Sequence, residues 1–236
     1  MDGKFLQATD IAGGSFALLL VASVGTAVLL LLGTGWVARR WKLPVALAGL
    51  IALIAVLHYA EARNIWQATH GQMPVIYRYA AWLIGVPVQV ATLYFFAGAL
   101  ARVPSGLFWR LMAVAIGMVL ARYMGEVGFM NATLGFLIGI IGWLYILGEL
   151  FFGRIGDIVT KSENEAAQTG MFWLRLIATV GWAIYPLSYF VASFAGGVDV
   201  AKLSIVYNLA DLINELTFAL VVLTAALRDQ PADQNA

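Results

Sequence analysis

Two carboxylates lie close together in an otherwise apolar segment near the end of the chain. Asp211 and Glu215 are four residues apart, with Asn214 between them, so both acids share one face if the segment is helical. An earlier apolar segment contributes Arg78, the obvious ion-pair partner for Asp211. Glu215 lacks a cation at its depth, so we expect it to be protonated and hydrogen-bonded within the bundle. Such a set could bind a ligand or ion, move protons, or join two helices through hydrogen bonds.

Aromatic residues form a second group at helical spacing. Trp182, Tyr185 and Tyr189 fall on one face of an apolar segment, and Trp82 lies one turn after Arg78. Aromatic side chains at this spacing are common in protein cores as well as in cofactor slots. By themselves, these residues therefore favour ordinary core packing over a cofactor slot.

The composition excludes several classes of protein. Hydrophobic residues make up 62% of the 236 residues and charged residues 11%, against about 45–50% and about 25% in soluble domains. The chain has no cysteine, which excludes disulfides, thiol catalysis and cysteine-based metal sites. A net charge of +1 gives no basic face for nucleic acid. HExxH, P-loop and Ser-His-Asp patterns are absent too, so we expect neither an enzyme nor a metal site.

The apolar residues occur in blocks long enough to cross a bilayer, for which about 20 residues suffice. These blocks predict an all-α membrane protein with seven transmembrane helices, at residues 14–37, 44–60, 74–100, 108–127, 133–153, 172–194 and 202–227. The polar stretch 154–170 is expected to form the fifth loop.

The positive charges predict the orientation of the chain in the membrane. The first loop carries Arg39, Arg40 and Lys42, and the third carries Arg102. Because cytoplasmic loops are enriched in lysine and arginine, we expect the odd loops inside and the N-terminus outside. One transmembrane domain would then span residues 1–228, followed by a polar cytoplasmic tail at 229–236.

Four stretches resemble helices of the microbial (type 1) rhodopsins, in the proteorhodopsin and xanthorhodopsin branch. Residues 78–87 resemble the third helix, 142–151 the fifth, 182–189 the sixth and 207–214 the seventh. The resemblance runs from about residue 15 to 228. It implies a seven-helix bundle around a covalently bound retinal, most often a light-driven proton pump. It also implies a bacterial cytoplasmic (inner) membrane and packing into oligomers.

The chain departs from this family where the resemblance places its photochemistry. Glu215 stands at the position of the lysine that binds retinal, and a carboxylate cannot form a Schiff base because that reaction needs an amine. The counterion and proton acceptor falls at Ala81, the nearby threonine at Gly85 and the proton donor at Thr92. His58, which in relatives partners the counterion, has lost that partner.

The walls of the implied retinal slot are better preserved than its chemistry. Matching positions supply the candidate binding residues Trp82, Met118, Trp143, Trp182, Tyr185, Tyr189, Asp211 and Glu215. A polar network of His58, Arg78, Asp211 and Glu215 is expected beside them.

We therefore interpret the chain as an opsin-like membrane protein without a covalent cofactor and without light-driven pumping. It would bind retinal or a related apolar ligand non-covalently, as a sensor, carrier or modulator. Two alternatives remain open: a ligand-free structural subunit that forms homo- or hetero-oligomers with rhodopsins, and a residual ion-transport protein.

Overall fold

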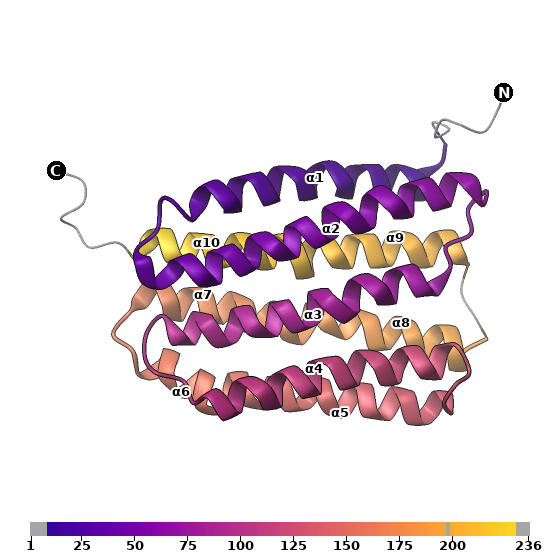
Figure 1. Ribbon diagram of the computed structural model, residues 1–236. Coiled ribbons are helices and arrows are strands. Elements are labelled where there is room, and N and C mark those ends of the chain that lie inside the picture. Colours follow the sequence, from indigo (N-terminus) through magenta and orange to yellow (C-terminus); the bar gives the residue numbers. More distant parts are fainter. Residues whose placement is uncertain (1–8, 197–198, 230–236) are drawn as a thin grey trace.

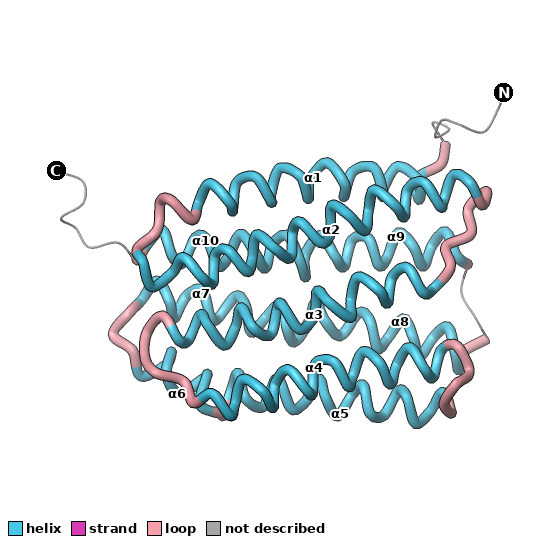
Figure 2. Tube along the Cα trace, in the orientation of Figure 1, coloured by secondary structure: helices cyan, strands magenta, loops and turns pink. Residues whose placement is uncertain are grey.

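The computed structural model describes residues 9–196 and 199–229, and this part of the chain forms helices and loops without strands (Figure 2). Seven helical spans run side by side and are long and apolar enough to cross a membrane (Figure 1), which confirms the predicted architecture. The spans are Ile11–Gly33 (α1), Arg39–Ala68 (ending in α2, Lys42–Ala68), Val75–Gly98 (α3), Ser105–Glu126 (α4), Ala132–Lys161, Glu165–Phe194 and Val200–Arg228.

The last two spans each contain a π-helical segment between two α-helices. The sixth span consists of α7 (Glu165–Leu176), η2 (Ile177–Gly181) and α8 (Trp182–Phe194), and the seventh of α9 (Val200–Asp211), η3 (Leu212–Thr217) and α10 (Phe218–Arg228).

The two π segments contact each other. Asn214 in η3 donates from Nδ2 to the carbonyl oxygen of Gly181 in η2, at 2.9 Å. A Cβ at Gly181 would collide with the Asn214 side chain, so glycine is required for this approach. Gln89 of α3 adds a third helix by donating from Nε2 to the carbonyl oxygen of Asn214, at 2.5 Å. Since π segments are rare and frequently lie at functional sites, they direct attention to this level of the bundle.

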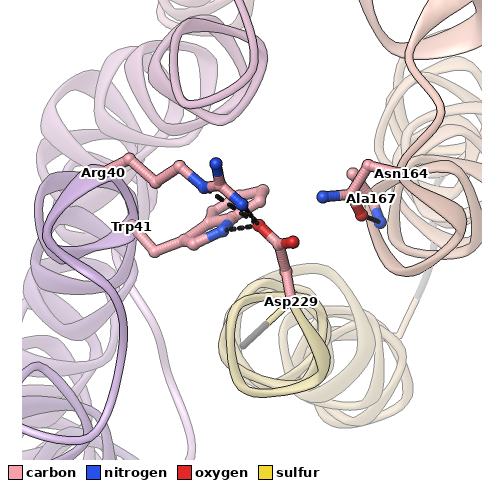
Figure 3. Close-up of polar contacts among 5 residues, drawn as sticks. All are labelled: Arg40, Trp41, Asn164, Ala167 and Asp229. Carbon is pink, nitrogen blue, oxygen red and sulfur yellow. Dashed lines mark hydrogen bonds and ion pairs between the residues drawn. The ribbon is translucent and has the colours of Figure 1, made fainter. Parts of the chain in front are cut away.

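The predicted fifth loop is wrong over most of its length. After α5 (Ala132–Phe151), residues Arg154–Lys161 form α6, and α7 begins at Glu165. The polar composition of α6 hid an amphipathic helix, which buries Ile155 and Val159. Asn164 caps α7 by accepting a hydrogen bond from the backbone nitrogen of Ala167, at 2.8 Å (Figure 3).

The second span also continues beyond the predicted residue 60, to Ala68. No glycine or proline interrupts it before Gly71, whose φ of +94° is the left-handed conformation that ends the turn.

The end of the last helix is tied to the first loop. Asp229 accepts hydrogen bonds from Arg40 Nη2, at 2.6 Å, and from Trp41 Nε1, at 2.5 Å (Figure 3). Trp41 itself is fully buried and packs edge-on against Phe96 of α3. Residue 229 therefore belongs to the packed structure, and the remainder of the predicted tail, 230–236, lies outside the described residues.

The predicted orientation can be tested with single cysteines because the chain has none of its own. Arg102 and Gln72 are exposed in loops at opposite ends of the bundle (Figure 1). We expect a membrane-impermeant maleimide to label Gln72→Cys in intact cells, and Arg102→Cys only after the cells are opened. Labelling of Arg102→Cys in intact cells would reverse the orientation.

Candidate functional site

Asp211 is buried in the middle of the bundle and is held by two tyrosines. The Tyr59 hydroxyl donates to Oδ2 at 2.5 Å, and the Tyr185 hydroxyl donates to Oδ1 at 2.6 Å. The donors come from α2 and α8, so the carboxylate joins three spans. Both oxygens of the acid are thereby paired with hydroxyl donors, as buried polar groups require.

The predicted ion pair between Arg78 and Asp211 is wrong. No nitrogen of Arg78 lies within 4.0 Å of a carboxylate oxygen in the described part of the chain. The guanidinium instead donates to Oδ1 of Asn208, at 3.4 Å, and lies over the rings of Phe16 and Tyr207. The tyrosine hydroxyls satisfy Asp211, and the two rings provide cation–π contacts for Arg78.

The other two members of the predicted polar network also lack direct links to it. His58 packs edge-on against the Tyr59 ring, and its Nε2 is buried without a hydrogen-bond partner. The Glu215 carboxyl group makes no hydrogen bond to a described residue, contrary to expectation, and instead lines a cavity. The four predicted groups thus occupy one region of the bundle without forming one connected network.

This cavity contains six of the eight predicted binding residues. It has a volume of about 60 Å³ and is lined by Tyr79, Trp82, Val86, Gln89, Met118, Val119, Arg122, Gly139, Trp143, Trp182, Tyr185, Pro186 and Glu215. Tyr189 and Asp211 are not in the lining. Tyr189 stacks on Phe136 and donates its hydroxyl proton to the carbonyl oxygen of Ala132, whereas Asp211 lies behind Tyr185.

The walls of the cavity are held by their own contacts. Trp82 packs edge-on against Tyr185, with ring centroids 5.1 Å apart. Trp143 donates from its indole nitrogen to the carbonyl oxygen of Ala178, at 2.8 Å. The rings are therefore fixed in orientation by neighbouring helices, and the cavity is preformed.

Glu215 lies opposite a position without a side chain. A Cβ added at Gly85 would be 4.0 Å from Glu215 Oε1, already at van der Waals distance. A larger side chain at position 85 would extend into the carboxyl group. Gly85 and Glu215 are thus sterically matched, which explains two of the departures from the rhodopsin pattern together.

The positions that resemble a proton acceptor and donor lie outside the cavity. Ala81 is half-buried, and Thr92 donates its hydroxyl proton to the Val88 carbonyl oxygen of its own helix, at 2.7 Å. Among the residues that line the cavity, Glu215 is the only carboxylate. The described cavity therefore has no second acid with which to exchange a proton.

Arg122 is a cavity residue that the sequence reasoning missed. It comes from α4, donates from Nη2 to the Tyr185 carbonyl oxygen at 3.0 Å, and places its guanidinium over the Tyr189 ring. Its side chain runs across Gly139, where a Cβ would lie 2.7 Å from Arg122 Cγ. The available signal was an arginine one helical turn after Met118, on the same face of an apolar span.

Comparisons with known proteins agree with this fold. The family model described as bacteriorhodopsin-like protein matches residues 12–228. The green-light absorbing proteorhodopsin of Gamma-proteobacterium EBAC31A08 is 33% identical over 96% of this chain and 91% of its own length. The blue-light absorbing proteorhodopsin of Gamma-proteobacterium Hot 75m4 is 34% identical, over 96% and 90%.

Solved structures extend the likeness to three dimensions. The blue light-absorbing proteorhodopsin from Med12 is 34% identical and superimposes with a TM-score of 0.79, covering 94% of this chain and all of the other. Xanthorhodopsin, described as a light-driven ion pump with dual chromophore, shares the fold at 22% identity, with a TM-score of 0.80 over 92% of this chain and 93% of the other. The chain is thus an integral membrane protein that belongs to the bacteriorhodopsin-like family of microbial rhodopsins and is close to the proteorhodopsins.

Proposed function

We propose that this protein is a rhodopsin-fold binding protein that forms no retinal Schiff base, does not pump protons in light, and holds an apolar ligand non-covalently. The observation that carries the proposal is the cavity, in which six predicted wall residues surround a carboxyl group where an amine would be needed. Rigid aromatic walls with few polar groups suit an apolar ligand. A role as sensor, carrier or modulator in the bacterial inner membrane follows from such binding.

The size of the cavity limits the ligand. At about 60 Å³ it is well below the roughly 150 Å³ in which an engineered apolar cavity binds benzene. The residues present therefore do not fit a covalently bound retinal, by chemistry or by volume. Retinal or a related polyene would enter only if side chains move, and Arg122 is the longest flexible side chain in the wall. A smaller apolar molecule needs less rearrangement.

The narrow cavity also favours a second candidate function. A ligand-free subunit would need a filled slot, and Arg122 together with the closely packed rings of Trp82 and Tyr185 fills much of the space. Such a subunit would act through oligomers with itself or with a true rhodopsin. Ligand titration distinguishes the two candidates, because only the first predicts saturable binding.

An absorption spectrum with added all-trans retinal tests the absence of a Schiff base. We expect the purified protein to give at most the near-ultraviolet band of free or weakly bound retinal, because Glu215 offers no amine. Hydroxylamine, which cleaves retinal Schiff bases, should leave this band unchanged in position. A hydroxylamine-sensitive band in the green would show that another lysine, such as Lys42 or Lys202, reacts.

Light-driven pumping is tested in a suspension of cells supplied with retinal. We expect illumination to change the external pH no more than in cells with an empty vector, because Ala81 and Thr92 cannot accept or donate the proton. A proteorhodopsin expressed in the same cells is the positive control. A light-induced signal that an uncoupler abolishes would contradict this part of the proposal.

A further inference from the structure

The charge of Arg122 is not balanced by any described residue. Its nitrogen atoms have no carboxylate oxygen within 4.0 Å, since the only ion pairs among described residues are Arg40–Asp229 and Lys161–Asp157. The nearest acid on its own helix is Glu126, one turn further on, which accepts a hydrogen bond from the Tyr79 hydroxyl at 2.6 Å. A buried, uncompensated cation is costly, so an anion that paired with it would be strongly favoured.

The guanidinium also has unused hydrogen-bond donors. An arginine carries five N–H donors, and here the only printed bond is the one from Nη2 to the Tyr185 carbonyl oxygen. Nε is buried and has no partner. Adjacent guanidinium nitrogens present the fork that pairs with a carboxylate through two parallel hydrogen bonds. The donor pattern therefore fits a carboxylate better than a hydroxyl or an aldehyde.

The surroundings of Arg122 determine the rest of the ligand. Beyond the guanidinium the cavity is lined by apolar and aromatic side chains, including Met118, Trp143 and Trp182. Glu215 enters from another side, because η3 packs against α2 and η2 whereas α4 packs against α3 and α5. A second negative charge on the ligand would approach this acid without a further cation among the lining residues to balance it.

We infer that the cavity binds an apolar monocarboxylic acid, whose carboxylate pairs with Arg122 and whose apolar body lies among Met118, Trp143 and Trp182. This inference rests on the proposed function, because it names the class of apolar ligand that the cavity takes. It adds a requirement that the proposed function lacks, namely that the head group be anionic.

The test compares matched acids and alcohols of equal chain length, from butanoate and butanol to octanoate and octanol. The protein is placed in nanodiscs of neutral lipid, and the fluorescence of its tryptophans is followed, because Trp82, Trp143 and Trp182 line the cavity. Each pair is titrated into the wild type and into Arg122→Gln. The ratio of alcohol to acid Kd, divided by the same ratio for the variant, cancels the different partitioning of acids and alcohols into lipid.

We expect this quotient to be at least about tenfold, the effect of a hydrogen bond to a charged group. Arg110→Gln, an exposed position on the same helix, is the matched control and should behave as the wild type. Thermal unfolding identifies a variant that fails to fold, and in that case the acid-to-alcohol preference of the wild type, measured against empty nanodiscs, still decides.

The outcomes separate the two levels of the argument. If acids and alcohols bind equally well in the wild type, or if Arg122→Gln keeps the preference, the inference is overturned while the proposed function stands. If no compound binds at any head group, both fail. Chloride alone is titrated as well, and a chloride response to which an apolar chain adds nothing would identify an inorganic anion site and overturn the inference.

Discussion

Replacing Glu215 with lysine, Ala81 with aspartate and Arg122 with alanine is expected to convert the protein into a visible pigment when all-trans retinal is added. Lysine supplies the amine for the Schiff base. Aspartate at position 81 supplies a carboxylate that stabilises the protonated Schiff base, which absorbs visible light. Removing the Arg122 side chain, which lies across Gly139, opens the cavity and removes a competing cation. Absorption spectra before and after hydroxylamine measure the result.

Three partial variants serve as controls for this pigment. Glu215→Lys with Arg122→Ala, but with Ala81 retained, should absorb in the near ultraviolet because the Schiff base lacks its carboxylate. Ala81→Asp with Arg122→Ala, but with Glu215 retained, should give no covalent pigment. Glu215→Lys with Ala81→Asp should yield much less pigment while Arg122 remains. Failure of the triple variant to bind retinal, in protein shown to be folded, would mean that the cavity is reshaped beyond these three positions.

Gly135→Ala is expected to destabilise the bundle, whereas Gly148→Ala in the same helix should change its stability little. A Cβ at Gly135 would lie 2.5 Å from the backbone oxygen of Ala121 and 3.1 Å from Gly125 Cα, so α4 and α5 would have to separate. Overpacking of this kind costs about 1–3 kcal/mol, and backbone atoms cannot rotate away as a side chain could. A Cβ at Gly148 meets nothing within 4 Å.

Thermal unfolding in detergent, followed by circular dichroism, compares the two glycine variants with the wild type. The pair controls for the general effect of exchanging glycine for alanine in α5, because only the contact with α4 differs. Equal unfolding temperatures for the two variants would show that the close approach of α4 and α5 does not limit stability.

Much of the fold could be predicted because its determinants are local in the sequence. The length and apolarity of the seven spans are visible in the composition of each segment, and TM1-type crossings need only about 20 apolar residues. The fifth loop was mistaken because α6 is short and polar on one face, so its buried Ile155 and Val159 form a weak pattern. The path of a polar connection depends on what it packs against, which its own residues do not specify.

The candidate site was predictable in its members but not in their contacts. The walls around Trp82 and Trp182 follow from the resemblance to rhodopsins, whereas the pairing of Asp211 depends on hydroxyl groups from two other spans. Charge alone suggested Arg78 as its partner, and the geometry assigned Tyr59 and Tyr185 instead. Arg122 was missed because the arguments followed positions with a role in the resembled family, and an added side chain has no such role.

The contact between the two π segments has a consequence for how these spans can change over evolutionary time. Each π segment winds an additional residue into its helix, and deleting one residue would turn everything beyond it by about 100°. Such a deletion in η3 would rotate Phe218 and Val222, both now fully buried, away from the core. It would also move Asn214 from Gly181. Descendants of this chain should therefore keep both lengthened turns or lose both together, so that the two spans inherit insertions and deletions as a pair.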